Sequence, residues 1–147
     1  MVRIWIALVC AAVMVVAGCG EPNGSDPEAD ARAVIDDAFA TFNAGDYDAW
    51  VEVRDRGASH ASEADRDETL ALMRDRERSL MEDGGHYEEI ECESHGDGSW
   101  PVAEAGDVDG WYFTCRTHFV FGDGWTAPET FEWVVADGDV VAVRSSR

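Results

Sequence analysis

The chain has 147 residues and a formal net charge of −20, from 31 acidic residues against 11 basic ones. A surface this acidic repels phosphate backbones, so we expect no nucleic-acid partner. A chain of this length normally folds as one domain around one core.

The N-terminal residues have the pattern of an export signal. Arg3 is followed by an uninterrupted apolar run over residues 4–16, which is shorter than the roughly 20 residues that a membrane-spanning helix needs. The run ends on Val16-Ala17-Gly18-Cys19, which resembles the bacterial lipobox. This resemblance implies cleavage before Cys19 and acyl chains, such as palmitate, on its sulfur. An ordinary cleavage site that releases a soluble protein is the alternative.

The expected organisation is therefore a signal peptide over residues 1–18, a lipidated tether over 19–26 and one folded domain over 27–147. Several acyl chains hold a protein on a bilayer far more firmly than one chain does. We expect the membrane as a partner through this lipid anchor, with the domain on the extracytoplasmic face of the cell membrane.

Three helices are predicted at the start of the folded domain. Asp26 is a favoured N-cap and Pro27 suits the first helical position, with apolar residues then recurring on one face to about Asn43. Asp46 caps a second, shorter helix, and Ser62 begins a third.

The apolar period changes from 3.6 to 2 in the second half of the chain. Over residues 111–121 every second residue is large or apolar, which predicts a strand with one buried face. A three-residue loop at 122–124 sets Phe113 opposite Trp133 on that face. We therefore predict an α+β fold, with N-terminal helices packed on an antiparallel sheet.

A second three-residue loop, at 136–138, sets Val141 opposite Trp133 on the same face. A two-residue turn at 137–138 instead sets Val141 opposite Val134 and divides the apolar residues between the two faces. The three-residue loop is therefore the prediction.

Residues 94–110 are rich in acidic residues and glycine. An EF-hand loop starting at Asp107 needs a glutamate at its twelfth position, where this chain has His118. We interpret the segment as a polar loop rather than a calcium site.

The order of helices before an antiparallel meander, together with the junction at residues 43–50, which reads NAGDYDAW, resembles the nuclear transport factor 2-like superfamily. This superfamily is also called cystatin-like, and the resemblance extends over about residues 26–147. It implies a sheet that wraps the long helix into a cone able to hold a pocket. Members include ketosteroid isomerase, polyketide cyclases and transport adaptors.

Two cysteines remain in the folded domain. Cys92 and Cys115 are expected to form a disulfide in an oxidising compartment. Each also begins a Cys-x-x-His motif, which raises the alternative of tetrahedral zinc. Residues three apart on a strand point to opposite faces, so Cys115 and His118 cannot both reach one ion. We predict the disulfide and no metal.

The inward face is predicted to be aromatic and apolar, without Asp, Glu, His or Tyr. Isomerases and cyclases of this fold need a base and hydrogen-bond donors in the pocket, so we predict no catalytic residue, no cofactor and no enzyme. Tyr47 and His60 are the remaining titratable candidates near the helix junctions. Two functions stay open: an interaction or structural domain for an envelope protein, or a module that binds a small apolar ligand. The residues expected to line such a pocket are Phe39, Trp50, Trp111, Phe113, Thr117 and Trp133.

Overall fold

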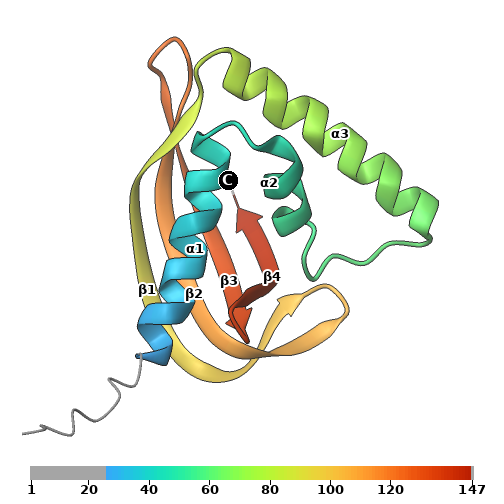
Figure 1. The fold of residues 1–147 in the computed structure, drawn as a ribbon, viewed down its shortest axis with the longest axis vertical. Coiled ribbons are helices and arrows are strands. Elements are labelled where there is room, and N and C mark those ends of the chain that lie inside the picture. Colours follow the sequence, from blue (N-terminus) through green and yellow to red (C-terminus); the bar gives the residue numbers. More distant parts are fainter. Residues whose placement is uncertain (1–25, 147) are drawn as a thin grey trace, which may run out of the picture.

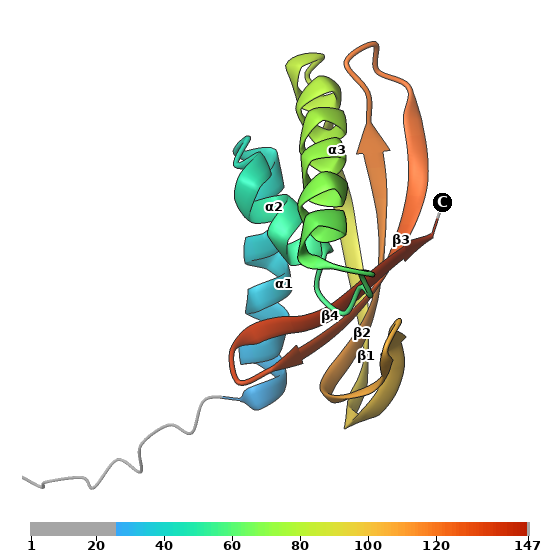
Figure 2. The same cartoon turned by 90° about the vertical axis from the view of Figure 1, so that its right-hand side faces the viewer.

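The computed structural model describes residues 26–146. The predicted signal peptide, the lipidation site Cys19 and the tether up to residue 25 lie outside the described residues. Three helices come first, α1 (Pro27–Asn43), α2 (Tyr47–Arg54) and α3 (Glu63–Glu82). They lie against one face of the sheet (Figures 1 and 2).

The helix starts match the capping residues read from the sequence. The side chains of Asp26, Asp46 and Ser62 each accept a hydrogen bond of 3.1 Å from a backbone N–H in the first turn of the helix that follows. Each cap satisfies an N–H that has no partner within the helix.

The second half of the chain forms four antiparallel strands in the order β1-β2-β3-β4. The fold is therefore α+β with one domain, as predicted. The strand bounds are β1 (His86–Ala103), β2 (Gly106–Val120), β3 (Thr126–Ala136) and β4 (Asp139–Ser146).

The hairpin between β2 and β3 has the predicted register. Phe113 pairs with Trp133 and Cys115 pairs with Phe131. The N–H of Phe121 donates a 2.8 Å hydrogen bond to the carbonyl oxygen of Trp125, across the three-residue loop. The alternation of large residues together with the loop length was sufficient to predict this register.

The prediction for the hairpin between β3 and β4 was wrong. Ala136 pairs with Asp139, which leaves a two-residue turn, and Trp133 pairs with Val143. Asp137 and Gly138 both have positive φ, at 52° and 78°, as a two-residue type I′ turn requires. A bulge over residues 140–142 then takes up the extra residue and restores the core face.

The prediction of a polar loop over residues 94–110 was also wrong, because nearly all of this segment is strand. β1 continues to Ala103 and β2 begins at Gly106, so only a tight turn separates them. This part of the hairpin extends past the main core and so lacks apolar alternation. Its apolar residues form a small second cluster on the outer face instead, where Val102 packs with Val134 and Ala142.

Candidate binding site

The predicted disulfide is present. Cys92 on β1 and Cys115 on β2 are direct cross-strand partners and their sulfur atoms are bonded. Both sulfurs are therefore used by the bond, and Cys115 is fully buried in the core.

The aromatic interior predicted as a ligand pocket is filled by its own rings. Phe39, Trp50 and Trp133 are buried, and their ring centroids lie 5.5 Å (Phe39–Trp133), 5.9 Å (Phe39–Trp50) and 6.4 Å (Trp50–Trp133) apart. Aromatic rings in contact have centroids about 4.5–7 Å apart. These three side chains therefore pack as a solid core.

The other three residues predicted for this pocket have different positions. Phe113 and Thr117 are buried on the inner face, and the Thr117 hydroxyl donates a 2.7 Å hydrogen bond to the carbonyl oxygen of Glu88. Trp111 is only partly buried and borders shallow surface hollows beside Val135. The structure thus brings five of the six residues to the core and leaves Trp111 at its margin.

The expectation of an interior without acids or tyrosines was wrong. Tyr87 is 2% exposed and Glu129 is 3% exposed, and the phenol donates a 3.1 Å hydrogen bond to Glu129 Oε2. Burial raises the pKa of Tyr87, and the negative charge of Glu129 raises it further. Glu129 shares the alternation of Phe131 and Trp133, so extending that pattern back through Pro128 would have placed it inside.

Two further charged side chains lie in this interior. The Arg54 guanidinium is 5.2 Å from the centroid of Phe131, and its Nη2 donates a 2.7 Å hydrogen bond to Ser145 Oγ. Glu77 is buried on α3, with Oε1 4.0 Å from Arg54 Nη1. The interior therefore combines an aromatic core with a small set of paired charges.

An open apolar pocket lies at the end of the inner face, next to the hairpin between β2 and β3. We call it the Trp125 pocket, because this tryptophan is 63% exposed. Its volume is about 270 Å³, and Glu129 is its single titratable lining side chain. The six lining residues are Phe119, Phe121, Trp125, Ala127, Pro128 and Glu129.

β4 is shorter than β3 and does not extend along the stretch of β3 that lines the pocket. The last residue of β4, Ser146, pairs with Thr130, so residues 126–129 of β3 have no β4 partner. Pro128 lies in this stretch, where a proline is tolerated because it cannot donate a hydrogen bond to a neighbouring strand.

The hairpin is also fixed against α3. It lies beside the C-terminal end of that helix in both views (Figures 1 and 2). Gly122 approaches so closely that a Cβ there would overlap the carbonyl oxygen of Asp83. Glycine at this position allows the approach, which holds the aromatic walls in place.

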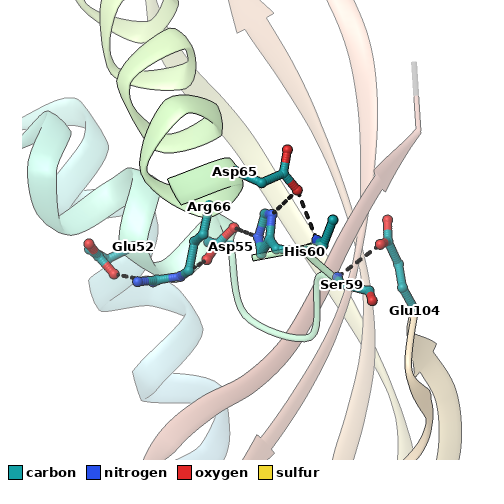
Figure 3. A network of polar contacts seen from close by, with 8 residues as sticks. Glu52, Asp55, Ser59, His60, Asp65, Arg66 and Glu104 are labelled. Atoms are coloured by element: carbon teal, nitrogen blue, oxygen red, sulfur yellow. Dashed lines mark hydrogen bonds and ion pairs between the residues drawn. The ribbon is translucent and has the colours of Figure 1, made fainter. Parts of the chain in front are cut away.

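His60 lies in a separate polar network at the junction of α2 and α3 (Figure 3). Its Nε2 is 2.7 Å from Asp55 Oδ1, and Arg66 Nε donates a 2.6 Å hydrogen bond to Asp55 Oδ2. The side chain of His60 is largely buried. Tyr47 is half-buried, and neither residue lines the Trp125 pocket.

This network connects the helix junction to the tip of the β1–β2 hairpin. The Ser59 N–H donates to Glu104 Oε2 at 2.9 Å, and the Glu104 N–H donates to the Gly57 carbonyl at 2.8 Å. Figure 3 shows Glu104 reaching the loop from the hairpin. Because these contacts join α2, α3, the loop between them and the β1–β2 hairpin, we assign the network a structural role.

Among residues 26–146, no three His, Cys, Asp or Glu side chains are grouped as a metal site would require. In the same part of the chain, none of the helices combines the length and the apolar character needed to cross a bilayer. No protein-family model matches the chain, and a search of curated proteins finds no relative.

Proposed function

We propose that this chain is an extracytoplasmic lipoprotein, anchored by a lipid on Cys19, whose domain is a non-catalytic binding module. The Trp125 pocket is its binding site. The observation that carries this proposal is a largely exposed tryptophan on an apolar pocket, in a molecule whose central aromatic residues are buried. Ligand pockets are mostly apolar with a few polar groups that set specificity.

The pocket is poorly equipped for isomerase or cyclase chemistry. General acid–base catalysis needs a base within reach of the substrate, and usually donors for the developing oxyanion. Glu129 is the one titratable side chain in the lining, and it already accepts a hydrogen bond from the buried phenol of Tyr87. The pair therefore supports binding and internal structure better than proton transfer.

The disulfide supports the proposed compartment, because such bonds persist in oxidising surroundings and are rare in a reducing cytosol. The order of three helices before a four-stranded meander supports the proposed relation to the nuclear transport factor 2-like superfamily. Membership of that superfamily and the cone shape are parts of the proposal.

The anchor is tested on the exported protein. Mass spectrometry of the membrane fraction should find a mature chain that begins at an acylated Cys19. Cys19→Ala should prevent acylation and processing at this site. An intact Met1 terminus on the mature protein, or a membrane-bound Cys19→Ala variant without the signal peptide, would contradict it.

Binding is tested with a neutral apolar probe on the full-length protein in maltoside micelles. With 5-fluorotryptophan incorporated, ¹⁹F NMR separates Trp125 from the other tryptophans once Trp125→Phe assigns its signal. We expect 3,3-dimethylbutan-1-ol to shift the Trp125 signal and leave that of Trp133 unchanged. The proposal is rejected if neither this alcohol nor its ammonium analogue choline shifts the Trp125 signal, or if turnover of a substrate is found that Glu129→Gln abolishes.

A further inference from the structure

Three aromatic rings form the walls of the Trp125 pocket. Phe119 and Phe121 have ring centroids 4.8 Å apart and planes 82° apart, so they make two nearly perpendicular walls. Trp125 adds a third ring, with its centroid 5.0 Å from that of Phe121. These rings contact one another, so a cation would lie against the ring surface that they present to the pocket, where the negative faces of aromatic rings attract it.

Negative charge lies at the base of the pocket and beside it. Glu129 lines the pocket itself. Asp83 and Asp123 line an adjoining hollow that shares the Phe121 wall. The formal net charge of −20 adds a long-range attraction for cations. Charge complementarity therefore favours a positively charged ligand and disfavours an anion.

The lining also discriminates between kinds of cation. A primary ammonium has three N–H donors that need acceptors after it leaves water, and this lining offers one carboxylate among apolar side chains. An alkylated ammonium has an apolar surface, a diffuse charge and few or no N–H donors. It loses little on desolvation and matches aromatic walls.

We propose that the Trp125 pocket binds a small, freely diffusing alkylammonium compound of the choline type. Its alkylated head lies against the rings of Phe119, Phe121 and Trp125, and the nearly buried carboxylate of Glu129 supplies the opposite charge from below the pocket surface. This inference rests on the proposed function, since it specifies the ligand of the same site. The volume of about 270 Å³ is near the lower end for ligand pockets, which favours a small molecule. A phosphocholine headgroup would bring its phosphate toward Asp83 and Asp123.

The test compares three probes that share the same bulky head. Choline carries the charge, 3,3-dimethylbutan-1-ol is its neutral isostere, and phosphocholine adds a phosphate. Each is titrated into the full-length 5-fluorotryptophan protein in maltoside micelles, with Trp125 as the ¹⁹F reporter. We expect choline to bind about tenfold more tightly than the isostere, and phosphocholine to bind more weakly than choline.

Two variants examine the recognising groups. Trp125→Leu keeps an apolar surface but removes the aromatic face, and should weaken choline binding about tenfold, as measured by calorimetry. Glu129→Gln should weaken the binding of choline and leave the binding of the isostere unchanged. If Glu129→Gln does not fold, the salt dependence of the wild-type protein replaces it. Added NaCl should then weaken choline binding and leave the isostere unaffected.

The outcomes separate this inference from the proposed function. Equal affinities for choline and its isostere would overturn the ammonium site but keep the pocket as a binding site. If neither probe shifts the Trp125 signal, both proposals fail. Phosphocholine binding more tightly than choline would overturn the free ligand in favour of a lipid headgroup.

Discussion

The centre and the open end of the inner sheet face carry the same kinds of side chain, but they differ in what covers them. At the centre, Trp133 lies between neighbouring strands and packs against Phe39 on α1, so it is fully buried. At the end, Trp125 lies beyond the last residue of β4 and is largely exposed. Coverage, rather than residue type, therefore separates the structural aromatic residues from those available to a ligand.

Tyr87 links the two regions. Its ring packs against Phe39, with centroids 5.4 Å apart, and its hydroxyl donates to Glu129 at the pocket. The charge at the base of the pocket is thus positioned from the covered core. A ligand in the proposed site would therefore not have to order this group on binding.

The largest expected effect is at the covered centre. Trp133→Ala should lower the free energy of unfolding by about 3–5 kcal/mol, because it leaves a large cavity among rings that cannot close over it. Urea denaturation followed by far-UV circular dichroism measures the change.

Trp125→Ala is the matched control, since it removes the same side chain where it is exposed. Its effect should stay within about 0.5 kcal/mol, as for most surface substitutions. Similar losses of unfolding free energy in the two variants would show that the difference in burial between Trp133 and Trp125 does not affect stability.

The disulfide should have the next largest effect. Replacing Cys92 and Cys115 together with alanine should lower the free energy of unfolding by about 3 kcal/mol, because the bond restrains the unfolded chain across a sequence separation of 23 residues. The same loss should appear when the wild-type protein is denatured with a reductant present. A reductant effect in the double variant would point to a different cause.

The sequence predicted the strand pattern of the centre because one rule, alternation with a period of two, controls it. The register of Phe113 with Trp133 followed from that rule and a loop length. The last hairpin did not follow, because a bulge at Val141 shifts alternation by one residue, and a bulge has no clear signal in a single sequence.

The candidate site was harder to predict than the fold. The interior was left open as a possible ligand pocket, because whether rings fill a space depends on how helices pack on the sheet. Glu129 was missed because the predicted alternation of Phe131 and Trp133 was not extended back past Pro128. Trp125 was missed because its exposure depends on what packs around the hairpin between β2 and β3, which no local pattern encodes.

The buried hydrogen bond between Tyr87 and Glu129 is expected to have an intermediate effect. Tyr87→Phe keeps the ring in the core but removes the donor to a buried carboxylate, and should cost about 1–3 kcal/mol of unfolding free energy. Chemical denaturation at pH 7 measures it. A loss below about 0.5 kcal/mol would indicate that the hydroxyl does not support Glu129.

The same tyrosine should make stability sensitive to alkali. Its pKa is raised in the folded state, mainly by burial, so its contribution is fully present below the unfolded pKa of about 10. Above that pH the phenol of Tyr87 ionises in the unfolded chain but stays neutral in the folded protein. Stability should then fall by up to about 1.4 kcal/mol per pH unit. Tyr87→Phe should show a shallower decline between pH 9 and 11, and an unchanged slope would argue against this origin.

The smallest effect on stability is expected for a solvent-exposed polar contact on the outer face of the sheet. Arg144 Nε donates a 2.6 Å hydrogen bond to Glu132 Oε2, and this bond lowers the pKa of Glu132. A carboxyl group with a lowered pKa stabilises the fold above its unfolded pKa, about 4.3, and loses that contribution as the pH falls through the folded pKa.

Arg144→Ala should therefore cost only about 0.5 kcal/mol at pH 7, because both side chains remain in contact with water. It should also reduce the loss of stability between pH 5 and 3, which denaturation at stepped pH would reveal. Arg144→Lys, which keeps the charge, serves as the control. A loss of unfolding free energy as large as that of Tyr87→Phe would mean that burial does not determine the strength of polar contacts in this molecule.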